Sequence, residues 1–229
     1  MKFKDFNFYN KSIDKDLKEF YTLMEYAFPD ENERDTFEKI CHYLMKNKQQ
    51  DNQYHVLIAY DNEKILGGSI FTYLNNSSSG VVEFIVVSPD IRQKGIGKAI
   101  YEEILNILKL NAKQNKKTLL YVFAEIDKPQ YRDETDRAYL YFWTSNGFKM
   151  LDIDYLQPAL EESKQSTSKL LIIIKPMTDK AMATKHIQDI FVDFFSVCFD
   201  MENVLSSNEY NLIKNSLHEP MVLTAIPLC

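Results

Sequence analysis

The chain has 229 residues, a net charge of −6 and a pI near 5.3, and 45% of its residues are hydrophobic. This length suits one large domain, or one domain with a small addition, and the hydrophobic content is enough for a packed core. The acidic balance argues against a nucleic-acid surface and favours small cationic substrates, and no apolar run is long enough to span a membrane.

The cysteines and histidines follow no metal-binding or disulfide pattern. The three cysteines are odd in number and none are spaced as C-x-x-C, and the four histidines are isolated. We therefore expect no metal ion. Unpaired thiols, and an N-terminus that lacks the unbroken apolar core of a signal peptide, predict a cytoplasmic protein.

In the first part of the chain, the spacing of hydrophobic residues predicts both strands and helices. The expected order is strand, helix, helix and three strands, at residues 6–8, 14–28, 33–48, 54–60, 65–74 and 81–87. Gly67 and Gly68 indicate a bulge or a close contact in the third of these strands. The polar residues 75–80 are expected to form a hairpin loop.

The second part continues with a helix at 96–115, a strand at 118–126, a helix at 133–146 and strands at 148–156 and 169–175. Gly147 is expected to cap the second of these helices. Helices between apolar strands, after an antiparallel beginning, predict an α/β fold of the α+β kind, with a mixed sheet covered by helices.

A change of composition at Pro176 divides the chain into a domain at 1–176 and a C-terminal helical extension at 177–229. The extension is expected to pack on the main domain or across a homodimer, and a role in closing the substrate site is the alternative. Its expected elements are a helix at 179–199, a second helix that begins with a capping box at Ser206 and Glu209, and a strand at 221–226.

The longer of these helices carries an aromatic stripe at Phe191, Phe194 and Phe195. A stripe of this size on a C-terminal extension must be covered by other parts of the protein or by a second copy.

A short basic loop with two glycines connects the strand at 81–87 to the helix at 96–115. Gly95 and Gly97 are two of only six glycines in the chain. Glycine lets backbone N–H groups approach a ligand closely, and the N–H groups at a helix start form an anion site with the helix dipole. Arg92, Lys94 and Lys98 add cationic side chains, so the sequence predicts a site for a phosphate or a pyrophosphate.

Two familiar phosphate loops are excluded by their spacing. No G-x-x-x-x-G-K-[ST] is present, and Ile100 stands where a dinucleotide loop has its third glycine. The glycines taken alone are also explained by a tight strand-to-helix turn that binds nothing.

The loop has the spacing R/Q-x-x-G-x-G/A, in the segment Arg92-Gln93-Lys94-Gly95-Ile96-Gly97. It resembles the acetyl-CoA pyrophosphate loop of the GNAT superfamily of N-acetyltransferases. A second mark, at residues 139–148, resembles the aromatic-x-x-x-Gly-Phe ending of that family, and the resemblance covers roughly residues 5–175. It implies a GNAT-like fold, acetyl-CoA as co-substrate, and transfer of the acetyl group to a primary amine of a small molecule by direct attack in a ternary complex.

The resemblance also implies which residues lie beside the coenzyme. The pantetheine arm would lie along the strand before the loop, with a backbone N–H of Val86 or Val87 as the oxyanion donor. The implied cofactor-binding residues are Ile85, Val86, Val87, Arg92, Gln93, Lys94, Gly95, Ile96, Gly97, Lys98 and Trp143.

The reaction needs a base, because an ordinary amine is protonated near neutral pH. Glu83 is the first candidate, since it stands in an apolar strand four residues before Val87, and Glu125 on a neighbouring strand is the second. An apolar setting is expected to raise the pKa of such a carboxyl group. The alternative is that each is a solvated or paired carboxylate at the rim.

The proton donor is less well defined by the sequence. Trp143 occupies the place of the tyrosine usual in the family, and an indole N–H has no usable acidity. Tyr141, or Tyr139 beside it, could replace that tyrosine, and a thiolate can also leave unaided. The missing tyrosine favours an alternative function, a non-catalytic acyl-CoA-binding or sensing module, and an α/β domain without a coenzyme site is the third interpretation.

Overall fold

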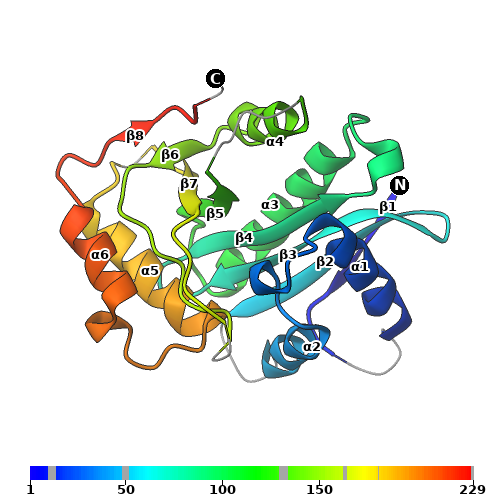
Figure 1. Ribbon diagram of the computed structural model, residues 1–229, viewed down its shortest axis with the longest axis horizontal. Helices are drawn as coiled ribbons and strands as arrows, with labels where there is room; N and C mark the ends of the chain where they lie inside the picture. Colours follow the sequence, from blue (N-terminus) through cyan, green and yellow to red (C-terminus); the bar gives the residue numbers. More distant parts are fainter. Residues whose placement is uncertain (10–13, 48–51, 129–133, 162–163, 180, 228–229) are drawn as a thin grey trace. The chain divides into compact units, whose positions relative to one another are not determined.

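A computed structural model describes residues 1–9, 14–47, 52–128, 134–161, 164–179 and 181–227. Both strands and helices occur along the whole chain (Figure 1). The strands are β1 (Lys2–Phe6), β2 (Gln53–Asp61), β3 (Lys64–Leu74), β4 (Ser79–Val87), β5 (Tyr121–Asp127), β6 (Lys149–Leu151), β7 (Leu170–Pro176) and β8 (Leu223–Thr224). The α-helices are α1 (Asp14–Ala27), α2 (Phe37–Lys46), α3 (Ile96–Gln114), α4 (Glu134–Ser145), α5 (Thr184–Cys198) and α6 (Asn208–Ser216). Short 3-10 helices are η2 (Glu31–Glu33), η4 (Pro89–Ile91) and η5 (Val204–Ser206). The predicted α/β class is confirmed.

Two compact units divide these elements. The first unit consists of residues 1–73 and 82–117, and the second consists of residues 74–81 and 118–229, so β4 contributes to both. In the first unit, β2 pairs with β1 and with β3, and both pairings are antiparallel. In the second unit the strand order is β5-β7-β6-β8, and these pairings are antiparallel as well.

Helices α1 and α2 cover one face of the strands in the first unit. Side chains alternate along a strand, so every second residue of β2 points to this face. The core there contains Leu17, Phe20, Met24, Ile40, Tyr43, Leu44, Tyr54, Val56, Ile58 and Tyr60. Each fully buried aliphatic or aromatic side chain of this size stabilises the fold by about 1.5–3 kcal/mol relative to exposure.

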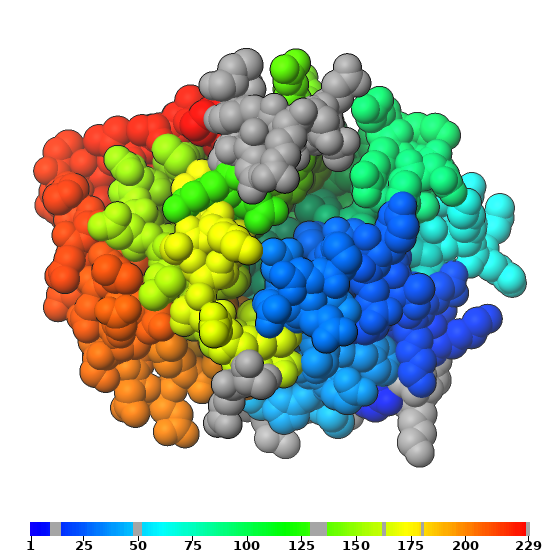
Figure 2. All heavy atoms as spheres, in the orientation of Figure 1, coloured from blue at the N-terminus to red at the C-terminus, as the bar shows by residue number. Residues whose placement is uncertain are grey.

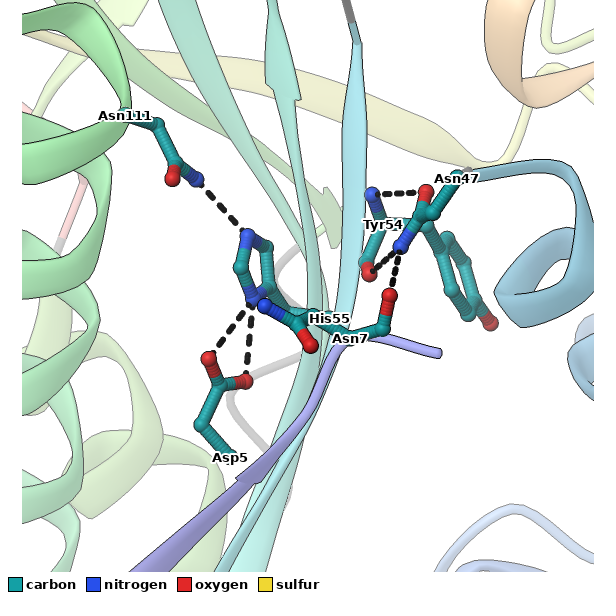
Figure 3. A network of polar contacts seen from close by, with 6 residues as sticks. All are labelled: Asp5, Asn7, Asn47, Tyr54, His55 and Asn111. Carbon is teal, nitrogen blue, oxygen red and sulfur yellow. Dashed lines mark hydrogen bonds and ion pairs between the residues drawn. The ribbon is translucent and has the colours of Figure 1, made fainter. Parts of the chain in front are cut away.

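Helix α3 covers the other face of the same strands, where His55 of β2 is only 1% exposed. Figure 3 shows how this ring lies between β1 and α3. The Nδ1 atom of His55 is 2.9 and 3.0 Å from the two carboxylate oxygens of Asp5, and its Nε2 is 2.7 Å from the side-chain amide nitrogen of Asn111. A carboxylate only accepts, so Nδ1 carries the hydrogen and Nε2 accepts from Asn111. Because both ring nitrogens are engaged in the interior, this network is structural.

Helices α5 and α6 cover one face of β5 and β7 in the second unit. The rings of Phe191, Phe194 and Phe195 are at most 1% exposed, and Phe194 meets Phe123 of β5 edge to face with 5.1 Å between ring centroids. The predicted aromatic stripe is therefore covered within this unit. The outer side of the two helices forms a continuous face, orange to orange-red in Figure 2.

A buried carboxylate attaches α5 to the turn between β3 and β4. Asp193 is 4% exposed, and its Oδ1 accepts from the side-chain amide of Asn76 at 2.9 Å while its Oδ2 accepts from the backbone N–H of Ser77 at 2.7 Å. Both oxygens are satisfied, which offsets the cost of burying the charge. Residues 184–216 thus share a core with β5 and β7, and the domain boundary expected at residue 176 stays a prediction.

The close contact expected at Gly67 and Gly68 is present. A Cβ atom on Gly67 would lie 2.3 Å from the carbonyl oxygen of Val86, and one on Gly68 would lie 2.4 Å from the carbonyl oxygen of Leu57. Only a residue without a side chain fits such an approach of two backbones.

Several boundary predictions are wrong. The helices expected at 33–48 and 179–199 begin only at Phe37 and Thr184. The first strand lies at Lys2–Phe6 rather than at 6–8, because Lys2, Lys4 and Asp5 hide its alternation, and Asp5 turns toward His55. The strand expected at 148–156 has only the three residues of β6, after which the chain leaves the sheet. The N-cap of α6 is Ser207, whose side chain accepts from the N–H of Tyr210, and not Ser206.

We expect Asn111→Leu to lower the free energy of unfolding by about 1–3 kcal/mol, because Nε2 of the buried His55 loses its partner. Chemical denaturation followed by circular dichroism measures this change. Asn106→Leu is the control, since Asn106 lies on the exposed side of the same helix. Equal stability of the two variants would show that the Asn111 contact contributes nothing.

We expect the buried Tyr101 of α3 to make the protein less stable at alkaline pH. Its side chain is 1% exposed, and burial raises its pKa far above the ordinary value. Above pH ~10 the unfolded chain releases this proton while the folded chain keeps it, so the free energy of unfolding falls by up to about 1.4 kcal/mol per pH unit. Tyr101→Phe should make the fall between pH 10 and 11 shallower in denaturation experiments. An unchanged slope would contradict this assignment.

Candidate active site

The loop between β4 and α3 has the backbone of an anion site. Gln93 and Gly95 have positive φ values of 63° and 79°, and Gly95 is the N-cap of α3. Alternation of left-handed and right-handed residues turns successive N–H groups toward one concave side. Gly95 has no atom within 4 Å of an added Cβ, so its φ value, and not crowding, requires glycine here.

The cationic side chains of this loop lie at its surface. Arg92, Lys94 and Lys98 are exposed, and the guanidinium of Arg92 donates from Nε to the carbonyl oxygen of Val87 at 3.3 Å. The first intrahelical bond runs from the N–H of Ala99 to the carbonyl of Gly95. The preceding N–H groups at the start of α3 are those that a helix cannot satisfy internally. A phosphate at this position would meet backbone donors, the helix dipole and three cations.

The end of β4 is held in place by β3. Gly67 brings its backbone against Val86 and Val87, and the N–H of Ser88 donates to the carbonyl oxygen of Leu66 at 2.9 Å. Val86 is 4% exposed, while Ile85 and Val87 are half-buried. The loop therefore leaves β4 at a fixed point, whereas the oxyanion role of the N–H of Val86 or Val87 stays a prediction.

Glu83 lies on β4 in the first unit and is half-buried. Its Oε1 accepts a hydrogen bond of 2.7 Å from the hydroxyl of Thr72, which is itself 1% exposed. The next residue, Phe84, meets Phe28 edge to face with 5.2 Å between ring centroids. The residue next to Glu83 thus belongs to an aromatic pair. The hydroxyl donor Thr72 was not indicated by the sequence.

Glu125 lies on β5 in the second unit, and Tyr155 and Gln157 are among its hydrogen-bond donors. The hydroxyl of Tyr155 donates to Oε1, and the side-chain amide of Gln157 donates to Oε2 at 2.9 Å. Burial, followed by the negative charge of Glu125, raises the pKa of Tyr155 well above its ordinary value. The structure therefore places Glu125 in a polar cluster, rather than alone among apolar side chains.

The aromatic residues of α4 differ strongly in exposure. Trp143 is 2% exposed and packs edge to face against Tyr139, Phe142 and Phe148, with 6.3, 5.0 and 4.9 Å between ring centroids. Tyr141 is 67% exposed and Tyr139 is 37% exposed. The proton-donor role of Tyr141 stays a prediction.

The structure brings some of the predicted residues together. Glu83, residues 85–87 and the loop at 92–98 form one continuous region of the first unit. Glu125, Tyr141 and Trp143 belong to the second unit. Tyr155, Gln157 and Thr72 were missed, because their contacts with the two glutamates join positions 11 to 32 residues apart and no spacing motif marks them.

Two further features are absent from the described parts of the chain. No group of three His, Cys, Asp or Glu side chains there could hold a metal ion. Among the described residues, none of the helices is long and apolar enough to cross a membrane.

Comparison with known proteins indicates the same family that the loop at 92–98 resembles. The sequence model of the acetyltransferase (GNAT) family matches residues 12–143, which is more than half of the chain. No curated protein matches the sequence.

Solved structures match the fold. A protein of Bacteroides thetaiotaomicron assigned to the GNAT acetyltransferases aligns with a TM-score of 0.64 and 18% identity, over 88% of this chain and 100% of its own. A ribosomal-protein-alanine N-acetyltransferase of Brucella melitensis aligns with a TM-score of 0.52 and 15% identity, over 77% of this chain and 100% of its own. At these identities the likeness concerns the fold alone, which is the predicted GNAT-like fold. On the match of the family model, this chain belongs to the acetyltransferase (GNAT) family.

Proposed function

We propose that the chain transfers an acetyl group from acetyl-CoA to a primary amine of a small molecule, by direct attack in a ternary complex. The observation that carries this proposal is the loop from Arg92 to Lys98, with its two positive φ values and its position at the start of α3. Membership of an acetyltransferase family supports the acetyl group as the cargo.

The residues of the loop fit the pyrophosphate of the coenzyme. A pyrophosphate needs several hydrogen-bond donors and positive charge around them. In this proposal the first N–H groups of α3 are the donors, and the side chains of Arg92, Lys94 and Lys98 bring the charge. Arg92, Lys94 and Lys98 are exposed and free to turn toward such a ligand without first leaving a core. When bound, acetyl-CoA supplies an activated acetyl thioester, and residues 85–87 would lie beside its pantetheine arm.

Glu83 is the proposed base. The acceptor reaches the site as an ammonium ion, and Glu83 takes one proton from it, directly or through a water. The free amine nitrogen then forms a bond to the acetyl carbon, the bond from that carbon to sulfur breaks, and the second nitrogen proton leaves with the thiolate or to water. Thr72 fixes one carboxylate oxygen of Glu83, and so sets the orientation in which the carboxylate would take the proton.

The leaving group needs little help from the protein. A thiol has an ordinary pKa near 8.5, so the thiolate is a stable leaving group at neutral pH. Trp143 cannot give a proton, and we propose Tyr141 as the donor where one is used.

A non-catalytic acyl-CoA-binding or sensing module is the alternative. The observation that favours it is Trp143, which stands in the place of the usual tyrosine and is buried. Both functions need the same coenzyme loop, and only the first releases free thiol in the presence of an amine. Release of thiol from acetyl-CoA, measured across a panel of amines, separates the two.

Location and assembly are part of the same proposal. We propose a cytoplasmic protein that binds no nucleic acid, membrane or metal, and that exists either as a single chain or as a homodimer. Cys41 and Cys198 are buried thiols, which supports a reducing compartment.

We expect Gly97→Glu to weaken binding of acetyl-CoA at least about tenfold, because a carboxylate at the start of α3 repels the pyrophosphate. Isothermal titration calorimetry measures the affinity. Asn106→Glu adds the same charge on the exposed side of the same helix and should bind like the parent. Parental affinity in Gly97→Glu would remove the coenzyme from this loop.

We expect Glu83→Gln to reduce turnover by about 10²–10⁴-fold, the usual effect of losing a general base, with little change in acetyl-CoA affinity. The amide oxygen of glutamine can still accept from Thr72, so the geometry is kept. Glu102→Gln on the exposed side of α3 is the control. Parental turnover in Glu83→Gln would exclude Glu83 as the base, and the same measurement in Glu125→Gln would then show whether the base lies there.

A further inference from the structure

Strand β4 has a short accessible stretch in its middle. Residues 54–60 of β2 and 65–74 of β3 are all buried. In β4, by contrast, residues 83–85 are half-buried, although Val82 before them and Val86 after them are only 2% and 4% exposed. The candidate base Glu83 therefore stands at the beginning of an accessible stretch in an otherwise buried strand.

The carboxylate of Glu83 lies on the side of the strands that α1 covers. In β3, a Cβ atom on Gly68 would lie 2.6 Å from the ring of Phe20 on α1. Side chains alternate along a strand, so Thr72, four residues after Gly68, points to the same side. The hydroxyl of Thr72 donates to Oε1 of Glu83 at 2.7 Å. This hydrogen bond therefore keeps the carboxylate on the α1 side of the first unit.

The ring of Phe84 reaches the same side, although Phe84 directly follows Glu83. It packs against the core that α1 and α2 form with β2, and it meets Phe28 edge to face with 5.2 Å between ring centroids. Consecutive residues of a regular strand point to opposite sides. A departure from this alternation is typical of the irregular strands found beside active sites. One side of β4 therefore carries both a carboxylate and an aromatic ring.

The position of Phe28 is fixed by a buried arginine. Arg34 is 7% exposed, and its Nη1 donates to the carbonyl oxygens of Phe28 and Pro29 at 3.0 and 3.3 Å. Its Nη2 lies 3.5 Å from Oε1 of Glu25 on α1. These carbonyl groups follow the end of α1, where a helix cannot satisfy them internally, so the guanidinium holds the turn that carries the ring. The protein itself thus sets the aromatic pair in place, as a precise binding group requires.

Both rings of this pair keep part of their surface accessible. Phe28 and Phe84 are half-buried, whereas Phe20 in the core beneath them is 2% exposed. Accessible apolar surface favours binding of an apolar group, because both leave water on contact. The segment 25–35 also carries five carboxylates and one guanidinium, and this excess of negative charge attracts an ammonium ion. The combination fits an amine with a charged nitrogen and an apolar substituent.

We propose that Phe28 and Phe84 bind the apolar substituent of the acceptor amine beside Glu83, with Arg34 as the positioning residue of Phe28. The acceptor class is then a primary amine that carries an alkyl or aryl group. This inference rests on the proposed function, with Glu83 as the base. All the residues that it uses belong to the first unit.

The test compares amines that share the ammonium group and the chain length and differ in apolar surface. Butylamine is paired with 2-methoxyethylamine, and heptylamine is paired with 2-(2-methoxyethoxy)ethylamine. Release of thiol from acetyl-CoA gives kcat and KM, and calorimetry with each amine gives the affinity without turnover. The variants are Phe28→Ala, Phe28→Leu, Phe84→Leu and Arg34→Gln. The control is Tyr26→Ala, which removes a ring that is 70% exposed on α1.

The parent should use heptylamine at least about tenfold better than its ether, because each methylene group that leaves water contributes up to about fourfold. Phe28→Ala should remove most of this preference through KM, with kcat for 2-methoxyethylamine changed less than about threefold. Phe28→Leu and Phe84→Leu keep an apolar side chain and should lose part of the preference. Arg34→Gln should raise KM for heptylamine and leave KM for acetyl-CoA unchanged, whereas a general loss of structure would affect both. Tyr26→Ala should retain the parental preference.

The outcomes separate the inference from the proposed function. A parent that acetylates amines without preferring alkyl to ether chains, or a Phe28→Ala protein that keeps the parental preference, overturns the inference alone. The inference also fails if Phe28→Ala changes the ratio of turnover with acetyl-CoA and butyryl-CoA but not the choice of amine, since the rings would then contact the acyl group.

Two further outcomes concern the transferase function itself. Binding of heptylamine that depends on Phe28, without release of thiol, supports the inference and overturns the transferase function. Absence of both turnover and amine binding overturns both. Melting temperatures of all variants show whether a loss comes from unfolding, and if Phe28→Ala unfolds, Phe28→Leu and Phe84→Leu decide.

Discussion

The left-handed backbone at Gly95 is the constraint on which the first unit depends. Its φ of 79° lets the chain turn from η4 into α3 within a few residues. The helix that begins there buries Ile100, Ile104 and Leu108 and brings Asn111 to His55. The same turn leaves the first N–H groups of α3 without helical partners. The core of the unit and the predicted anion site therefore both depend on this one residue, and a side chain at position 95 would strain both.

Much of the fold follows from local patterns. The spacing of apolar residues identified every long helix and strand, because each of these elements has one face in a core, as α3 and β2 do. The short or polar elements were misplaced. The strand β1 is set by its pairing with β2 and by the contact of Asp5 with His55, which lies 50 positions away. The residue at which β6 ends depends on contacts with α6, such as that of Asp154 with Ser216.

In the candidate site as well, local patterns are visible in the sequence and contacts between distant segments are not. The turn at 92–98 could be predicted because the backbone of consecutive residues forms it, and glycine spacing records that directly. Its role in binding the coenzyme stays a prediction. The surroundings of Glu83 and Glu125 could not, since Thr72, Tyr155 and Gln157 reach them through pairing and packing of separate segments. An apolar sequence around a glutamate therefore said little about its environment. Of the neighbours of Glu125, Tyr155 lies in a stretch that was expected to continue as a strand, and Gln157 follows directly after that stretch.

The hydrogen bonds of Asp193 affect how the chain folds during synthesis. They join α5 to Asn76 and Ser77, which are 117 and 116 positions earlier, and residues 74–81 belong to the unit that is otherwise made last. Contacts that close such long loops form slowly. At about 5–20 residues per second, the ribosome needs on the order of ten seconds to reach Asp193 after it has made the turn. Throughout that time, Leu74 and Val81 lack the aromatic residues of α5 that share their core in the folded protein.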